Sequence, residues 1–451
     1  MAHEKFHYKS LEEVQAKAAE LGLSLPFAAD TSALTKPLTV RNITFPNRMG
    51  IAPMEGADST PDGAPSEYTL RRYVNEAIGG SAVIWFEAIS IVEEGRSSKT
   101  QLLLTRDTLD AYKAFTAAIK EAGLKANGFA PYLIMQANHS GRYSNPGNKP
   151  APMIAYRHPE LEQYRAADES CIVTDDYLKA LEEKFGEAAL LAKEAGFDAV
   201  DIKSCHGYLL AELSSAYTRP GEYGGSFENR TRLLRNGILA AKAYEDSSFM
   251  VTCRLGIYDG YAYPYGFGVS PESGLTPDLT EPIRLVRELH DTYGLDMMNL
   301  TMGNPYATTH VTRPFDKGKY QPDEHPFVGL DRMIHGIGTV KNAVPEMTVF
   351  ASAPSYLRRY ADLYSAGAIE QGLCDGMLFG RMAFADPDFA NEIIRDGRIN
   401  PKRVCMTCGS CGDLIRAHKP TGCVIRDPET FMPFFREFQE IKKTQPANFR
   451  G

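Results

Sequence analysis

The feature of this 451-residue chain that most constrains its fold is a regular alternation of short apolar runs and longer segments with helical spacing. The longer segments, such as 109–123, 177–196 and 228–245, place apolar residues three and four positions apart, as amphipathic helices do. Repeated strand–helix–strand units predict a parallel sheet, because neighbouring parallel strands need a crossover connection. Eight apolar runs can be counted, at residues 47–54, 81–90, 130–139, 198–206, 249–256, 295–303, 347–353 and 375–382.

Eight repeats favour a closed (β/α)₈ TIM barrel over an open doubly wound sheet, and no Gly-x-Gly-x-x-Gly motif follows the first run. We therefore expect an α/β protein with its barrel at 36–400, a helical extension at 1–35 and a cysteine-rich segment at 401–451. Within the extension, Ser10 and Glu13 form a capping-box pattern that predicts a helix ending near Gly22.

Composition and charge exclude several classes of protein. A hydrophobic fraction of 43% and a charged fraction of 24% are typical of globular domains. The net charge is -8 and the basic residues form no long run, so nucleic acid is not an expected partner. Neither a signal-peptide pattern nor a membrane-spanning apolar stretch is found, so we expect a cytoplasmic protein without a membrane partner. Whether it forms a homo-oligomer stays open.

Four of the eight cysteines gather in the stretch VCMTCGSCGDLIRAHKPTGCV. In a reducing compartment, clustered thiols are more often metal ligands or redox groups than structural disulfides. Zinc sites made of four thiolates typically use two pairs separated by a longer spacer. The three-plus-one spacing here is closer to that of cubane iron–sulfur ligands, so a cluster is favoured, while zinc and free thiols remain open. The four cysteines are Cys405, Cys408, Cys411 and Cys423.

Several segments at the ends of the predicted strands resemble one known family. They are IAPMEG (51–56), QANHSGR (136–142), DIKSCHGYLL (201–210), YGGSFENR (223–230) and LFGRMAFADPDF (378–389). Together with the cysteines they resemble the old yellow enzyme family of flavin-dependent ene-reductases, in particular the branch that contains 2,4-dienoyl-CoA reductase. The resemblance runs from about residue 36 to 430 and implies FMN at the C-terminal mouth of the barrel. It also implies reduction of an activated C=C bond in an α,β-unsaturated carbonyl compound.

The resemblance implies flavin contacts at several strand ends. Gln136 is an amide in an apolar strand that would bond the pyrimidine edge of the ring, or else serve as a structural amide. Arg254 would pair with a negatively charged reduced flavin, or else with a barrel carboxylate such as Asp201. The phosphate is expected near strands seven and eight, where the family's glycine pair is replaced by ASAPSYL. The remaining cofactor residues implied are Pro53, Met54, Glu55, Ala351, Ser352, Gly380 and Arg381.

The same resemblance implies three catalytic residues. Tyr208, in HGYLL, would donate a proton to the α-carbon of the substrate while flavin N5 delivers hydride to the β-carbon, and tyrosine is protonated at neutral pH. His206 lies two residues earlier and is expected on the same side of an extended strand. His206 and Lys203 would hydrogen-bond the activating carbonyl, although Lys203 departs from the family and could instead pair with Glu55. The role of the nearby polar pair, His139 and Arg142, stays open: the two side chains could belong to the site or could anchor a loop.

The four clustered cysteines are implied to hold a [4Fe–4S] cluster, with one residue fewer between the second and third ligands than in the family. The cluster would pass single electrons to the flavin. Larger relatives carry a second half that binds FAD and NADPH, which this chain lacks, so we expect a separate electron-donor protein or NAD(P)H itself as the reductant.

Two alternatives to the ene-reductase stay open. They are an oxidative amine dehydrogenase, of the trimethylamine type, with the same architecture, and a zinc-stapled barrel without catalytic activity. Two long loops, 140–174 and 304–328, follow predicted strands and are expected to shape the substrate pocket. They would suit an aromatic, steroid-like or acidic enoate.

Overall fold

Eight parallel strands close into a barrel in this computed structural model, which describes residues 4–163, 165–272, 274–317 and 321–444. Their order around the barrel is β10-β3-β4-β5-β6-β7-β8-β9, with consecutive neighbours except where the last strand meets the first. Each strand lies inside one of the eight apolar runs, so the predicted TIM barrel is confirmed. The strands are β3 (Met49–Ile51), β4 (Val83–Ser90), β5 (Tyr132–Asn138), β6 (Ala199–Ile202), β7 (Met250–Gly256), β8 (Met297–Thr301), β9 (Thr348–Ser352) and β10 (Gly376–Phe379).

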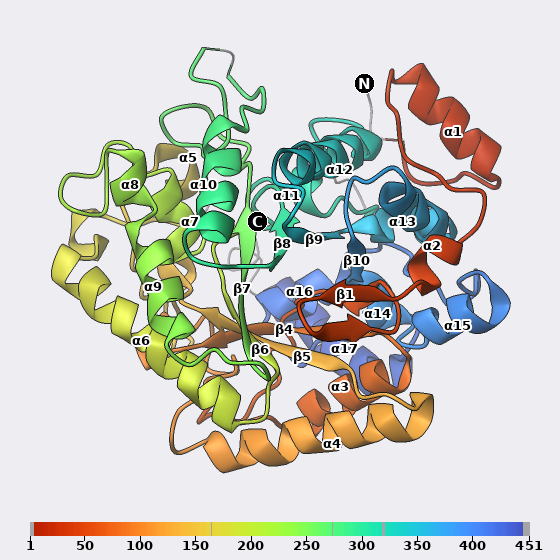
Figure 1. The fold of residues 1–451 in the computed structure, drawn as a ribbon, viewed down its shortest axis with the longest axis horizontal. Helices are drawn as coiled ribbons and strands as arrows, with labels where there is room; N and C mark the ends of the chain where they lie inside the picture. The colour runs from red at the N-terminus through yellow and green to blue at the C-terminus, as the bar shows by residue number, and fades with distance from the viewer. Residues whose placement is uncertain (1–3, 164, 273, 318–320, 445–451) are drawn as a thin grey trace.

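Helices surround the strands, and Figure 1 shows α4, α6, α9, α10, α12 and α13 around their outer side. The larger helices are α3 (Glu67–Ile78), α4 (Leu109–Asn127), α6 (Asp175–Glu194), α9 (Arg232–Lys242), α10 (Thr280–Asp291), α12 (Pro326–Ala343), α13 (Ala361–Glu370), α15 (Phe389–Asp396) and α17 (Pro428–Thr444). Short helices mark the loops, namely α2 (Ser32–Thr35), α5 (Pro159–Glu162), α7 (Leu209–Ser214), α8 (Phe227–Arg230), α11 (Thr309–Thr312), α14 (Arg381–Ala385) and α16 (Ser410–Arg416). Four 3₁₀ segments are Glu93–Gly95, Gly141–Tyr143, Glu169–Cys171 and Pro354–Tyr360.

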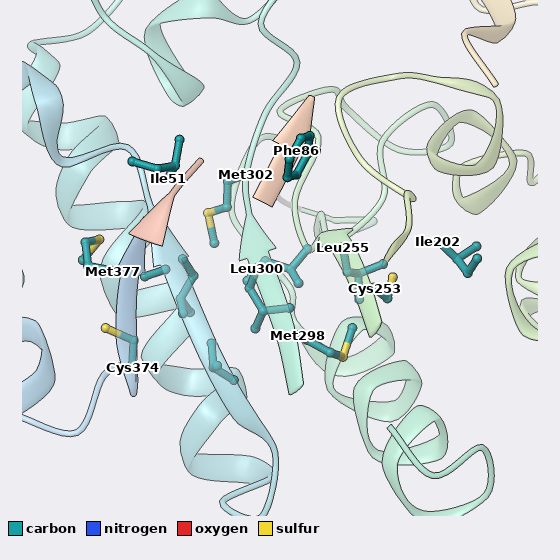
Figure 2. Packing of buried hydrophobic residues seen from close by; sticks show 14 of the residues in the cluster. Ile51, Phe86, Ile202, Cys253, Leu255, Met298, Leu300, Met302, Cys374 and Met377 are labelled. Carbon is teal, nitrogen blue, oxygen red and sulfur yellow. The ribbon is translucent and has the colours of Figure 1, made fainter. Parts of the chain in front are cut away.

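Along each barrel strand the side chains alternate between the helix layer and the barrel interior, as period-two geometry requires. On β7, Cys253 and Leu255 belong to the large apolar cluster shared with the surrounding helices, and on β8 so do Met298 and Leu300. Figure 2 shows these four side chains along the two strands. The residues between them therefore point into the barrel.

A hairpin closes the N-terminal end of the barrel. Its strands β1 (Leu38–Val40) and β2 (Ile43–Phe45) pair in antiparallel fashion. Phe45 joins a second apolar cluster with inward side chains of the lower barrel, including Trp85 and Phe350. Because apolar side chains fill this end, the cavity described below lies at the opposite, C-terminal end of the strands.

The N-terminal extension contains the predicted helix. α1 (Leu11–Glu20) starts after Ser10, whose hydroxyl accepts a hydrogen bond from the Glu13 backbone N–H. The capping box is half formed, because the Glu13 carboxylate accepts from the Lys9 N–H rather than from Ser10.

The segment after the barrel folds against its mouth. Helices α16 and α17 pack together around Leu414, Val424 and Phe431. The Thr421 N–H donates to the Gly56 carbonyl oxygen at 2.8 Å, which ties this segment to the loop after β3. Within the described residues, none of the helices combines the length and apolar character needed to cross a bilayer.

Candidate active site and cysteine cavity

A cavity lies at the C-terminal mouth of the barrel, the end at which TIM-barrel proteins have their active sites. Each barrel strand contributes one inward-facing residue to the cavity. This residue is either among the last residues of the strand or at the position directly after the strand. These residues are Ala52, Ala88, Gln136, Lys203, Arg254, Thr301, Ser352 and Gly380.

Asp201 fixes the polar groups on the cavity floor. The Gln136 Nε2 and Trp85 Nε1 groups each donate to Asp201 Oδ2 at 2.6 Å. Burial raises the pKa of this carboxyl, while the hydrogen bonds that it accepts oppose the rise. Among the described residues the buried Gln136 Oε1 atom finds no hydrogen-bond partner. Asp201 therefore holds the Gln136 amide with its acceptor available to a ligand.

Arg254 is oriented by its neighbour on β8 rather than by a carboxylate. Its Nε donates to Asn299 Oδ1 at 2.8 Å, and its backbone N–H donates to Asp201 Oδ1. In the described part of the chain its guanidinium forms no ion pair, so the suggested pairing with Asp201 is not seen. The cation lines the cavity and is 5% exposed.

Tyr208 lies in the cavity wall with its hydroxyl between two oxygens. It donates to Glu55 Oε1 at 2.8 Å, and it lies 2.6 Å from the Tyr306 hydroxyl. Lys203 Nζ lies 3.7 Å from the centroid of the Tyr208 ring, so the ammonium contacts the ring rather than forming an ion pair with Glu55. Burial raises the pKa of Tyr208 well above its usual value and lowers that of Lys203 to about 8.

His206 reaches the same cavity by a different route from the one predicted. β6 ends at Ile202, and His206 and Gly207 have φ of 66° and 70°, so the expected extended strand through His206 is wrong. The left-handed turn still brings the imidazole into the cavity that Tyr208 lines. Burial, then the nearby cation Arg254, lowers the pKa of His206, which keeps the ring neutral. Its buried Nε2 lacks a partner within the described chain.

Three of the four positions predicted for the phosphate region line the cavity. Ser352, Gly380 and Arg381 line the cavity, whereas Ala351 faces the helix layer and does not. The alternation of β9 turns the Ser352 side chain inward and the Ala351 side chain outward. The expectation that Ala351 offers its backbone N–H to a phosphate stays a prediction. Arg381 Nη1 donates to the Pro314 carbonyl oxygen at 2.9 Å.

Of the remaining predicted positions, Pro53, Met54 and Glu55 line the cavity at the end of β3. His139 and Arg142 do not: His139 contacts the Tyr177 hydroxyl at 2.9 Å, and Arg142 pairs with buried Glu212. These two residues anchor the loop after β5.

Sequence reasoning missed several lining residues. Thr301 could have been found from the inward parity of β8, which Asn299 shares. Ala52 and Ala88 were also missed, and they are apolar residues at or next to strand ends. The others carry no local signal, because they come from loops and from the segment after the barrel: Pro305, Tyr306, Thr312, Arg313, Ala353, Ser355 and Ile415. The loop 304–328, expected to shape the pocket, supplies four of them.

The four clustered cysteines line a second, smaller cavity beside the mouth. The loop that carries them bends through Thr407 (φ 52°) and Gly409 (φ 74°), and Cys411 lies in the first turn of α16. Two backbone groups donate to sulfur, Thr407 N–H to Cys405 Sγ at 3.3 Å and Arg426 N–H to Cys423 Sγ at 3.4 Å.

The thiols of the cysteine cavity are not arranged as a ready-made site for a single ion. Burial raises the pKa of the Cys405 thiol to about 12 and of the Cys423 thiol to about 11, so a bound cation would be needed to ionise them. Among the described residues, no three His, Cys, Asp or Glu side chains are grouped so as to hold one metal ion. Arg381 lines both cavities, so the two sites are neighbours.

Comparison with known proteins gives one family. The model of the NADH:flavin oxidoreductase / NADH oxidase family matches residues 33–266. An NADPH dehydrogenase of Bacillus velezensis is 33% identical over 223 residues, covering 48% of this chain and 62% of the relative. An NADPH dehydrogenase of Clostridium acetobutylicum is 29% identical over 277 residues, covering 60% of this chain and 74% of the relative. The chain therefore spans less than two thirds of the first relative's length.

Solved structures share the fold. A complex of 2-naphthoyl-CoA reductase with 2-naphthoyl-CoA has a TM-score of 0.73 at 19% identity, over 90% of this chain and 58% of that one. Histamine dehydrogenase from Rhizobium sp. 4-9 has a TM-score of 0.67 at 20% identity, over 90% and 53%. The old yellow enzyme homologue from Zymomonas mobilis has a TM-score of 0.61 at 20% identity, over 81% and 94%. These likenesses confirm the barrel fold.

Proposed function

Because this chain belongs to the NADH:flavin oxidoreductase / NADH oxidase family, we propose that it is an FMN-dependent ene-reductase. Its substrate would be an α,β-unsaturated carbonyl compound whose activated C=C bond is reduced. The observation that carries the proposal is a buried tyrosine hydroxyl, on Tyr208. It shares one cavity with amide, imidazole and hydroxyl atoms that have no hydrogen-bond partner in the described part of the chain.

The residues of the cavity fit the polar groups of FMN. Gln136 Oε1 is an available acceptor for a ring N–H, and the Arg254 guanidinium is a donor and positive charge beside it. Ser352 Oγ, Gly380 and Arg381, at the ends of β9 and β10, supply donors for a phosphate. Bound FMN would supply hydride chemistry that none of the side chains can perform.

Three side chains would handle the substrate. His206 and Lys203 are donors that can bind the carbonyl oxygen and stabilise negative charge that develops on it. Tyr208 holds a proton on Oη at neutral pH, since burial raises its pKa, and can give it to the α-carbon. Lining residues Tyr306 and Ile415 exclude water from the reacting carbon.

The four cysteines would hold a [4Fe–4S] cluster that passes electrons singly toward the flavin. Two backbone N–H groups already directed at Cys405 and Cys423 sulfur support this, because such bonds tune cluster potentials. The electrons would come from a separate donor protein or from NAD(P)H. The relatives named NADPH dehydrogenase favour a nicotinamide reductant, and the adjoining cysteine cavity favours a protein donor.

Oxidation of an amine is the second candidate function. Glu55 Oε1 accepts a hydrogen bond from the Tyr208 hydroxyl at 2.8 Å, so the pair could also remove a proton from a substrate. Histamine dehydrogenase has the same fold, which makes the alternative worth testing.

An anaerobic titration separates the two. The purified protein is analysed for flavin, iron and sulfide, reduced chemically, and mixed with a panel of aromatic, steroid-like and acidic enoates. We expect the flavin absorbance to return with a reduced product in equal amount. Bleaching of the oxidised protein by amines, without reoxidation by enoates, would favour the second function, and absence of flavin would exclude both.

A further inference from the structure

A third cavity adjoins the mouth cavity and the cysteine cavity, and its wall carries an excess of positive charge. Five cationic side chains and one carboxylate line it: Arg313, Lys317, Arg381, Arg416 and Lys442, with Asp413. The whole chain has a net charge of -8, so the local excess is opposite in sign to the charge of the protein. Positive charge gathered in a cavity attracts anions and raises their local concentration.

Arg313 connects this cavity with the mouth, because its side chain lines both. It follows α11 on the long loop 304–328. A β-carbon on Gly412 of α16 would lie 3.2 Å from Arg313 Nη1, so this helix packs closely against the guanidinium. The guanidinium therefore lies between the mouth of the barrel and α16.

Among the described residues, Arg313 has no counter-charge. Its Nη2 donates to the Pro305 carbonyl oxygen at 3.3 Å, and its buried Nε has no hydrogen-bond partner there. Asp413 instead pairs with Lys317 and, at 3.5 Å, with Arg416. A cation that is removed from water without a paired anion is costly. A bound anion would offset this cost.

Burial and neighbouring cations both act against the charged form of these arginines. Burial, and then the charge of Arg416, lowers the pKa of Arg313 to about 10. Burial also lowers the pKa of Arg416. Both side chains still carry their charge at neutral pH, so their repulsion persists. An anion bound at Arg313 would relieve it.

The other cations of the mouth already have roles in the proposed chemistry. Four cationic side chains line the mouth, namely Lys203, Arg254, Arg313 and Arg381. Arg254 and Arg381 are assigned to the flavin ring and its phosphate, and Lys203 is assigned to the substrate carbonyl. The charge of Arg313 is the one left without a role.

Arg313 lies on the side of the mouth where the substrate would react. Pro305, whose carbonyl oxygen accepts from Arg313, directly precedes Tyr306. The Tyr306 hydroxyl lies 2.6 Å from the hydroxyl of Tyr208, the proposed proton donor. A ligand that contacts Tyr208 therefore extends toward Arg313 when it passes Tyr306.

We propose that the substrate carries a second, anionic group, a carboxylate or a phosphate, which Arg313 binds with help from Arg416. This inference rests on the proposed ene-reductase function. The planar fork of the guanidinium suits both anions, since each can accept two parallel hydrogen bonds. Binding is ionic and changes no covalent bond. Among the aromatic, steroid-like and acidic enoates that the long loops would suit, the acidic class fits this site.

The test uses ketones that carry a remote anion but no activated C=C bond, so that binding is measured without turnover. Equilibrium dialysis against the oxidised holoenzyme compares 4-acetylbenzoate with the neutral 4-acetylbenzamide. We expect the acid to bind roughly 10–100-fold more tightly, the usual worth of hydrogen bonds to a charged group. 4-Acetylphenyl phosphate is the third ligand: tighter binding than that of the benzoate favours a phosphate, and weaker binding favours a carboxylate.

Three variants locate the preference for the acid. Arg313→Met should remove most of it, and Arg313→Lys, which keeps the charge and loses the fork, should keep part of it. Arg157→Met is the matched control and should keep all of it, because Arg157 pairs with Glu162 outside the cavity. Equal binding of acid and amide by wild type, or a preference that Arg313→Met retains, would overturn the proposal.

Two further measurements separate the substrate from other anions. Flavin content that falls in both Arg313→Met and Arg313→Lys would assign the cation to the FMN phosphate. A KM for NADPH that rises in Arg313→Met, with the preference for the acid unchanged, would assign it to the reductant. Either result overturns the proposal. If no enoate reoxidises the reduced protein, the ene-reductase function fails, while the dialysis still decides whether Arg313 binds an anion.

Discussion

The barrel mouth and the cysteine segment are neighbouring sites that are built in opposite ways. The mouth takes one inward residue from each of eight strands, from Ala52 to Gly380, and so it exists only when the barrel is closed. The cysteine cavity takes its four thiols from residues 405–423, which cover the loop before α16, its first turn and the segment that follows the helix. The first site depends on the global fold, whereas the second depends on a local loop and on what it binds.

The two sites nevertheless touch. Arg381 lines both cavities, and Ile415 of α16 reaches the mouth. Variants that disable one site and spare the other measure how independent the two are.

The largest effect is expected from Cys411→Ala. In the proposed [4Fe–4S] site this variant removes one thiolate ligand, so iron and sulfide content should fall to near zero and turnover driven by a protein donor should stop. Flavin binding and chemically driven turnover should persist, because the ligands lie outside the eight strands. Cys171→Ala, which changes a half-buried cysteine outside the cavity, is the control and should keep the full iron content. Full iron content in Cys411→Ala would show that the ligand set is wrong.

Tyr208→Phe is expected to impair the chemistry of the mouth and to leave the cysteine segment unchanged. Removal of the proton donor should slow reoxidation of reduced protein by an enoate by roughly 10²–10⁴-fold. Iron content, flavin content and the rate of flavin reduction should stay near wild type, as measured by stopped-flow absorbance. Equal losses in both half-reactions would indicate a structural role for the Tyr208 hydroxyl.

Lys203→Met tests how much folding free energy is lost because a charged lysine is buried in the mouth. Burial holds the pKa of Lys203 at about 8, below its ordinary 10.5, so the unfolded chain binds an extra proton between these values. The charged lysine therefore costs folding free energy below pH 8, and the cost fades as the pH rises toward 10.5. The variant also loses the contact between the lysine and the Tyr208 ring, which removes part of the gain. The net free energy of unfolding at pH 7 should still be higher than that of wild type by about 1–2 kcal/mol. Urea unfolding of flavin-free protein at pH 7 and pH 10 should show the gain shrinking; a gain that grows with pH would contradict this account.

The smallest effect comes from a pair of neighbours on β9. Ser352→Ala removes an inward hydroxyl and should weaken flavin binding by about 1 kcal/mol, with little change in stability. Ala351→Ser adds a hydroxyl to the apolar helix layer and should lower stability by about 1–3 kcal/mol without changing flavin affinity. Equilibrium dialysis and thermal unfolding of both variants check this, and the reverse result would mean that the register of β9 differs.

Much of the mouth could be predicted because strand geometry has a strict period. Apolar runs located all eight strands, and the polar residues Gln136 and Arg254 stand out in them because a buried polar group needs a partner. Parity would also have separated Ser352 from Ala351, since residues on one face of a strand recur every second position. His206 reached the cavity through a left-handed turn that its residue type does not announce.

Loop contributions to the mouth could not be predicted individually. The sequence indicated that 304–328 shapes the pocket, but the contact of Tyr306 with Tyr208 joins residues that lie 98 positions apart. The local sequence around either tyrosine does not indicate that the two side chains are in contact. The position of Ile415 in the wall depends in the same way on how α16 docks.

The sequence by itself determined the barrel, the cysteine ligand candidates and most inward polar residues, because these follow from local periodicity and from spacing within short stretches. Only the tertiary structure decided that Asp201 orients Gln136, that Lys203 contacts a ring rather than Glu55, and that the hydroxyl of Tyr208 lies between two other oxygens. Those relations depend on closing the barrel, which brings distant strand ends within hydrogen-bond distance, and such closeness leaves no mark in the order of the residues.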